Sequence, residues 1–567
     1  MIVAAQQTRT CPGVRPAAKP PAVVPRIQPL SPRLAAALSY GFALLLGAGL
    51  ALALFPAEML VPRAGGAFAP QGDAAQHAIA QRYFLADDWR WPLLTAANLR
   101  PPEGVNIAFV DGIPLLALLL KAAFPLLPEG FHGIGLWYAI AWTLQPVAAV
   151  WALRGAGETR LLPAIGVALA ASAMPSFVNR YGHAALTGHF CLLLALGAYA
   201  RLVRGGGVAG WAGAAGLAVG TLLVHPYLAA MALALLAAVP TTLLLRGDRR
   251  WIGAAGGLVA TVAAVFGTMA MLGYLGATGD GGYGDFALNL LSPVWPYRSL
   301  VLGWLVEREV DATGHGGWEG YNWLGLGLLA GLVLLVAAAP RAVGSALRRH
   351  AGLALALAGL TLLALSFRVG AGGAVLVDLG DPPGFLEQFR ASGRFFWPVG
   401  LALLVGAAAL LARLPRFGPV AVLALGLLQF ADAAPNRAAL AAWAGQRQPW
   451  TVEATPLRAL LAEARSVAIF PTWPCVPKPD TLGDHGRQLQ VLNLAAERGV
   501  TANTMYVARW RGERPRCDDA AAIAAPLAPG ELRIVLPGAR DQALASMPGA
   551  AALCAPLGEV LACRLGR

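Results

Sequence analysis

The segment LAAALSYGFALLLGAGLALALF at residues 34–55 decides the fold class. It carries no charge and has about the length at which a helix crosses the hydrocarbon core of a bilayer. With 57% hydrophobic and 13% charged residues, the whole chain is too apolar for a soluble domain. Similar stretches of about 14 to 25 residues recur along the chain. They lie at 133–153, 161–178, 186–203, 211–224, 226–245, 251–275, 323–340, 351–368, 395–413 and 417–434.

These stretches predict a mainly α fold, a polytopic transmembrane helical bundle of about eleven spans. The pair His225-Pro226 interrupts one long apolar region, which we interpret as two short spans. The run at 113–127 contains Lys121 and Pro125, so we expect a half-inserted or interfacial helix there.

The formal net charge of +13 lies in short arginine clusters between the apolar stretches, and not on one face or in a tail. We therefore expect no nucleic-acid partner. The clusters fall in every second loop, which by the positive-inside rule places those loops and the N-terminus in the cytoplasm. This pattern predicts a multi-pass protein of a bacterial inner (plasma) membrane. The clusters are Arg154 with Arg160, Arg201 with Arg204, residues 246–250, Arg341 with Arg348 and Arg349, and Arg413 with Arg416.

The same alternation divides the chain into three parts. Residues 1–33 are a cytoplasmic N-terminal tail, and residues 34–434 are the transmembrane domain, with a first outer loop at 56–132. Residues 435–567 regain charges of both signs and contain strand-like runs, SVAIF at 466–470 and ELRIVLP at 531–537. We predict a small extracytoplasmic α/β domain for this third part.

The cysteines agree with an external C-terminal domain. Cys475, Cys517, Cys554 and Cys563 all lie there, whereas Cys11 is in the tail and Cys191 in an apolar stretch. Four cysteines outside the cytoplasm permit two disulfides. Whether Cys475 pairs with Cys517 and Cys554 with Cys563 stays open.

The predicted spans contain almost no ionisable groups, with His189 and the terminal Asp432 the main exceptions. Ion-coupled transporters bind charge near the middle of the membrane, so this composition disfavours that class. The acids of the predicted outer loops indicate that any site using carboxylates is external.

The first outer loop is the richest in such groups. Asp73 and His77 share a helix face at i, i+4, and Asp111 follows in the segment VDGIP. A carboxylate beside a histidine can accept a proton from a hydroxyl nucleophile or bind a divalent metal. The alternative is that Asp73 and Asp111 cap the helices that follow them.

Six stretches of the sequence form a set: GDAAQH (72–77), WPLL (91–94), VDGIPLLALLLK (110–121), NRYGHAALTGHF (179–190), GDFALNLLSPVWP (284–296) and FRASGRFFWP (389–398). Together they resemble the GT-C superfamily of polytopic membrane glycosyltransferases, in particular an uncharacterised bacterial branch, over about residues 34–434. The resemblance implies a GT-C-like bundle, a polyprenyl-phosphate sugar donor, inversion at the anomeric carbon and a catalytic aspartate in the first outer loop. By position that residue is Asp73, with Asp111 as a second acid.

A lipid-phosphate donor needs cations near the outer leaflet to hold its phosphate. Arg390 and Arg394 are four residues apart, just before a predicted span, and run against the inside preference of arginine. Arg180 with His183 forms a second candidate. Asp285 lies in the aromatic loop 277–322, which suits either a sugar or isoprenoid channel or an ordinary interfacial belt.

The sequence thus predicts a glycosyltransferase that moves a sugar from a polyprenyl-phosphate lipid to a glycan, lipid or protein acceptor on the outer face of the inner membrane. Asp73 and Asp111 are the predicted catalytic residues. His77, Arg180, His183, Asp285, Arg390 and Arg394 are the predicted substrate-binding residues. A divalent metal stays open, since no D-x-D or E-x-D stands in the first loop. The alternatives are a non-catalytic lipid-linked-glycan flippase or permease and a structural membrane subunit.

Overall fold

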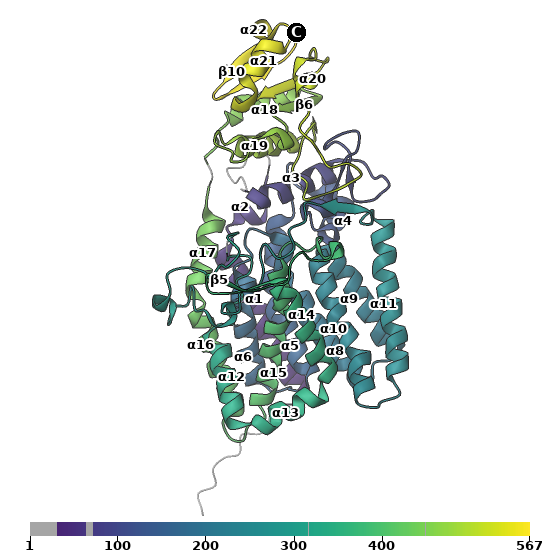
Figure 1. The fold of residues 1–567 in the computed structure, drawn as a ribbon, viewed down its shortest axis with the longest axis vertical. Coiled ribbons are helices and arrows are strands. Elements are labelled where there is room, and N and C mark those ends of the chain that lie inside the picture. Colours follow the sequence, from purple (N-terminus) through teal and green to yellow (C-terminus); the bar gives the residue numbers. More distant parts are fainter. Residues whose placement is uncertain (1–30, 64–71, 316, 448, 567) are drawn as a thin grey trace, which may run out of the picture.

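The computed structural model describes residues 31–63, 72–315, 317–447 and 449–566. The predicted cytoplasmic tail therefore lies almost wholly outside the described residues, as does Cys11. The chain is mainly helical. A bundle of helices occupies most of its length, and a smaller sheet-containing region formed by the C-terminal residues sits at one end of the bundle (Figure 1).

Among the described residues, six helical segments are long and apolar enough to cross a membrane, or eight if each of two bent pairs counts as one span. The bent pairs are α12 (Leu326–Ala338) with α13 (Pro340–Arg349), at 102°, and α16 (Gly418–Asp432) with α17 (Ala434–Gly445), at 45°. These helices indicate a membrane protein. The six are α1 (Pro32–Leu54), α5 (Ile134–Gly155), Ala184–Gly205 containing α8 (His189–Gly205), α10 (Pro226–Leu245), α11 (Trp251–Met271) and Ser392–Leu411 containing α15 (Trp397–Leu411).

Three further apolar helices are shorter, namely α6 (Leu161–Ser172), α9 (Val208–Val224) and α14 (Ala351–Leu365). Proline explains two of these lengths. Pro226 follows α9 and Pro175 follows α6, and the residue before a proline is disfavoured in helical conformation. The count of about eleven spans is therefore not reached by length alone.

Small residues hold the helices of the bundle together. On α1 the buried positions include Ala43, Gly47 and Ala51, whereas Leu45 and Leu52 are exposed, the reverse of a soluble helix. A Cβ on Gly47 would lie 2.6 Å from the carbonyl oxygen of Trp142 in α5. Such close backbone approach is typical of helix pairs in membranes, where packing replaces the hydrophobic effect.

Helix α13 lies at the end of the bundle away from the C-terminal region (Figure 1), and one cavity there is lined by arginines from four of the arginine-rich segments, Arg204, Arg246, Arg349 and Arg413. Arg246 Nε donates to the Arg349 carbonyl at 2.6 Å, and Arg160 Nη2 donates to the Ala412 carbonyl at 2.6 Å. The arginine-rich loops that the sequence predicts to share one side of the membrane are thus neighbours in space.

The C-terminal region contains a five-stranded sheet in the order β10-β11-β9-β6-β7. Strand β6 pairs in parallel with both of its neighbours, β9 and β7. Strand β11 pairs antiparallel with both of its neighbours, β9 and β10. Both predicted strand runs are confirmed. The strands are β6 (Ser466–Phe470), β7 (Thr501–Ala502), β9 (Glu531–Val535), β10 (Cys554–Leu557) and β11 (Val560–Cys563), and the main helices are α18 (Ala454–Glu463) and α19 (Asp484–Ala496).

Two disulfides join Cys475 to Cys517 and Cys554 to Cys563, which resolves the pairing that the sequence left open. Cys191 is a buried free thiol in α8. The predicted domain boundary after residue 434 falls at the bend between α16 and α17.

The C-terminal region is docked firmly on the bundle through the predicted first outer loop. Helix α3 (Gly72–Ala86) packs on α19, where Tyr83 Oη donates to the Val500 carbonyl at 2.7 Å and Arg82 Nη1 donates to Asn493 Oδ1 at 2.5 Å. Strand β3 (Ala277–Gly279) also pairs antiparallel with β8 (Arg509–Arg511). These contacts bring residues 506–509 to the mouth of a polar cavity.

Candidate active site

A cavity of about 290 Å³ opens at the end of the bundle that faces the C-terminal region. Its walls come from segments far apart in the sequence: α3, the turn at residue 111, the loop before α8, the junction of α9 with α10, and three later loops. Residues 506, 508 and 509 of the C-terminal region complete it. The lining includes the predicted residues Asp73, His77, Asp111, His183, Arg390 and Arg394.

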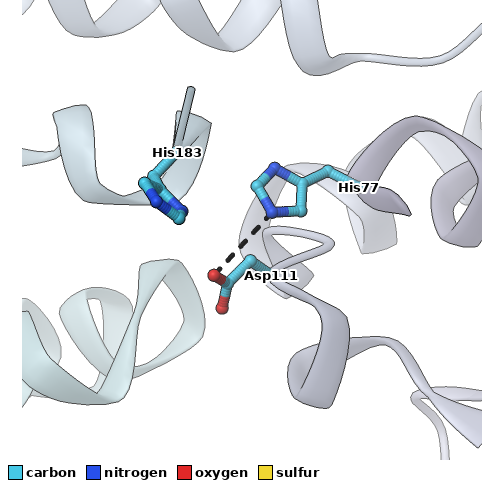
Figure 2. A group of neighbouring side chains, drawn as sticks. All are labelled: His77, Asp111 and His183. Carbon is cyan, nitrogen blue, oxygen red and sulfur yellow. Dashed lines mark ion pairs between the residues drawn. The ribbon is translucent and has the colours of Figure 1, made fainter. Parts of the chain in front are cut away.

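Helix α3 supplies the first wall. Asp73 lies in its first turn, where the helix dipole favours negative charge, and His77 lies one turn later. The two side chains do not pair with each other. His183 Nε2 is 3.4 Å from Asp73 Oδ2, and His77 Nε2 is 3.8 Å from Asp111 Oδ2. Figure 2 shows the rings of His77 and His183 on either side of the space that the Asp111 carboxylate enters.

A constrained turn holds Asp111 in that position. The residue follows the 3-10 turn Ile107–Val110 and has a φ of 50°, and Ile113 also has a positive φ, of 51°. The left-handed region is unfavourable for a β-branched residue, so the surrounding contacts must hold this turn. One such contact is from Gln81 of α3, whose side-chain amide donates to the Gly112 carbonyl at 2.7 Å.

The alternative role of Asp111 as a helix cap is wrong. The helix that follows, α4 (Pro114–Ala122), has Ile113 at its N-cap position and no side-chain cap bond. The Asp111 carboxylate instead accepts from His225 Nε2, at 3.2 Å. Burial raises the pKa of Asp111, but its three histidine neighbours, His225 foremost with His77 and His183, together lower it by more, so the pKa lies below its usual range and the group is ionised at neutral pH.

His225 has a defined orientation. It lies between α9 and α10, and its Nδ1 accepts from the backbone N–H of Tyr227 at 3.1 Å. The neutral ring therefore carries its proton on Nε2, the atom that faces Asp111. His77 is also neutral near pH 7, because burial lowers its pKa to about 4.

The second wall is a buried ion cluster centred on Glu319. Arg180 Nη1 and Arg394 Nη2 each lie 2.5 Å from a Glu319 carboxylate oxygen, and His183 Nε2 lies at 3.3 Å. Burial raises the pKa of Glu319, but the two guanidinium groups lower it well below its usual range. Two arginines on one carboxylate leave one positive charge, with Arg394 on the cavity side.

Two more arginines extend the positive wall. Arg390 is half-exposed, and its Nε lies 3.3 Å from Asp285 Oδ2. Arg509, from strand β8, donates to the Gln388 carbonyl at 2.5 Å and lines the cavity. Aromatic rings accompany these cations, with Trp318 stacked parallel to His183 at 5.9 Å. The first wall thus presents Asp73, Asp111 and histidines, the second presents arginines and aromatic faces around Glu319, and His183 contacts acids of both walls.

Three residues of the first wall could hold a divalent cation. One ligand atom from each of His77, Asp111 and His183 lies within 4.8 Å of the others. Imidazole with carboxylate suits first-row transition metals. His225 would support such a site from behind, because it binds the second oxygen of Asp111.

The structure brings six of the eight predicted site residues to one cavity. Arg180 is fully buried behind Glu319, and Asp285 pairs with Arg390 outside the lining. Sequence reasoning missed His225, Glu319 and Arg509. The break at His225-Pro226 was a usable signal, because a histidine between two apolar helices rarely lies there by chance. Glu319 and Arg509 carried no local signal.

The fold and the cavity indicate a helical membrane protein with a polar site at one end of its bundle. The chain belongs to the DUF6311 family, whose model, described as a domain of unknown function, matches residues 44–434. A second model, the DUF6311 C-terminal domain, matches residues 456–565. No curated protein matches the sequence.

Proposed function

We propose that the protein is a membrane glycosyltransferase of GT-C type that transfers a sugar from a polyprenyl-phosphate carrier to an acceptor at the outer face of a bacterial inner membrane. One observation carries the proposal. Asp73, His77, Asp111 and His183 line the same cavity as Arg390, Arg394 and Arg509, at the end of an apolar helical bundle. A base and anion-binding groups at one site are what displacement of a lipid phosphate requires.

Asp73 is the base in this mechanism. Its carboxylate is about half-exposed, at 47%, and therefore accessible to an acceptor hydroxyl. The acceptor oxygen bonds to the anomeric carbon as the bond from that carbon to the phosphate oxygen breaks, and the hydroxyl proton passes to Asp73. Attack opposite the leaving group inverts the anomeric centre. Asp111 assists as a second, partly buried negative charge beside His77.

The arginine wall receives the leaving phosphate. Negative charge develops on the phosphate oxygen as the carbon–oxygen bond breaks, and guanidinium groups stabilise that charge through charge-assisted hydrogen bonds. Arg394 is held in place by Glu319, so it needs little reorganisation to bind. A divalent cation on His77, Asp111 and His183 would add Lewis-acid stabilisation.

Replacing Arg509 with glutamine is expected to raise the KM for a polyprenyl-phosphate sugar about tenfold or more, with a smaller change in kcat, because one charge-assisted phosphate contact is lost. Initial rates of the purified full-length chain against donor concentration measure this. The matched control is Arg511→Gln, two residues along the same strand and absent from the cavity lining. Equal effects of the two substitutions would place Arg509 outside donor binding.

The proposed orientation has about eleven helices crossing the membrane, counting the three shorter ones, with the cavity and the C-terminal region outside. The arginine-rich turns then lie in the cytoplasm, and the two disulfides lie where oxidation persists.

Labelling with a membrane-impermeant maleimide tests this orientation in cells whose outer membrane is permeable. After mild reduction, Cys475 and Cys517 should react while the inner membrane is intact. An Arg249→Cys variant, in the turn after α10, should react only after that membrane is broken, with peptide mass identifying each labelled site. The opposite labelling pattern would show the reverse orientation and would contradict the proposed function.

A further inference from the structure

A second large cavity, of about 640 Å³, lies at the end of the bundle opposite the candidate active site. It is bounded by α5, α8, α13, α14 and α15. Much of its wall is aliphatic, including Leu353, Val405 and Leu410. Four arginines also line it: Arg204, Arg246, Arg349 and Arg413. The cavity therefore combines an apolar wall with a cluster of cations.

Among the residues that the structure describes, no aspartate or glutamate lines this cavity. Within the described part of the chain, the hydrogen bonds of the lining arginines go to backbone carbonyls, for example from Arg246 to Arg349 and from Arg413 to Ala156. The two acids of the neighbouring turns are engaged elsewhere, because Glu158 pairs with Arg160 and Asp248 with Arg250, each at 2.5 Å. The positive charge at the cavity thus lacks a carboxylate partner.

The position of the cavity matches the surface region of a bilayer. Helix α13 bends away from α12 by 102° and lies across the end of the bundle (Figure 1). Its sequence PRAVGSALRR places arginines at both ends of a short helix, as expected for a segment in the headgroup region. The cavity lies between this helix and the helices that the proposed orientation places across the membrane, and in that orientation its cations lie at headgroup depth and its aliphatic wall reaches toward the hydrocarbon.

We propose that this cavity binds an anionic phospholipid of the same membrane leaflet. The arginines hold the headgroup phosphate and its further negative charge, and the aliphatic wall receives part of an acyl chain. A free phosphate ion would leave the aliphatic wall without a partner, and a zwitterionic headgroup would leave the cations only partly neutralised. The lipid joins α13 to α8 and α15 and stabilises this end of the bundle.

Thermal unfolding of the purified full-length protein in a non-ionic detergent tests the proposal. Titration with phosphatidylglycerol should raise the unfolding midpoint, whereas phosphatidylcholine and inorganic phosphate should raise it little. The double variant R349Q/R413Q should weaken the apparent phosphatidylglycerol affinity about tenfold or more. The matched control R341Q/R348Q also removes two positive charges, both from α13, and should change that affinity by less than about twofold, because neither residue lines the cavity.

A third variant keeps all the charges and fills the cavity. Gly406 lines it, and a Cβ built there meets nothing within 4 Å, so Gly406→Leu should fold and lower the phosphatidylglycerol affinity by occupying the acyl position. If both double variants weakened the phosphatidylglycerol affinity equally, the effect would come from general surface charge, and the proposal would be overturned. Equal stabilisation by inorganic phosphate, or unchanged binding in Gly406→Leu, would also overturn it.

Discussion

Replacing Asp73 with asparagine is expected to lower the rate of sugar transfer by a factor of about 10² to 10⁴, the range that loss of a general base produces. Asparagine has nearly the same shape as aspartate and can still contact His183, so the cavity should keep its form. What is lost is the negative charge that accepts the acceptor's proton. The loss should appear in kcat more than in the KM for the lipid donor.

The matched control for this prediction is Asp88→Asn. Asp88 is an exposed acid of the same loop that does not line the cavity, so its replacement should leave the transfer rate within about twofold. Membrane levels and chromatographic profiles of both variants would establish that they fold. A folded Asp73→Asn variant with normal transfer would remove Asp73 from the mechanism.

Replacing Glu319 with glutamine is expected to destabilise the protein by about 3 to 5 kcal/mol, because it leaves buried positive charge without a counter-ion. The Arg180 side chain is 1% exposed and forms its ion pair with this carboxylate. Arg394 and His183 contact the same carboxylate and would lose that partner as well. The thermal unfolding midpoint in detergent, followed by tryptophan fluorescence, measures the loss.

An exposed ion pair provides the comparison for that experiment. Glu58 contacts Arg447 at 3.0 Å with both side chains more than half-exposed, so Glu58→Gln should cost less than about 1 kcal/mol. If Glu319→Gln were as mild as Glu58→Gln, the Glu319 cluster would not organise the arginine wall. Donor binding would then have to rest on Arg390 and Arg509.

Much of the fold follows from local sequence. Each predicted apolar stretch contains a helix, because about 14 or more uncharged apolar residues can satisfy their backbone in a membrane only in that way. The lengths of the helices are harder to predict, since Pro175 and Pro226 end helices within apolar stretches. The strands at 466–470 and 531–535 follow from β-branched runs, but their parallel pairing is set by contacts between distant segments.

The candidate site was predictable in part for the same reason. Asp73 and His77 share a helix face, and Arg390 and Arg394 precede a span, so both pairs had a local pattern. The position of Asp111 depends on a left-handed turn held by Gln81, which no spacing reveals. Arg509 reaches the cavity only because β8 pairs with β3, more than two hundred residues earlier.

The central claim is tested most directly by incubating the purified full-length protein with a synthetic short-chain polyprenyl-phosphate sugar and an acceptor extract from membranes. Mass spectrometry would follow the released polyprenyl phosphate and the new glycoside. We expect both products to accumulate together with the wild-type protein, with the anomeric centre inverted, and neither to accumulate with Asp73→Asn. Movement of the lipid across a liposome bilayer with no release of polyprenyl phosphate would contradict the claim and favour a flippase.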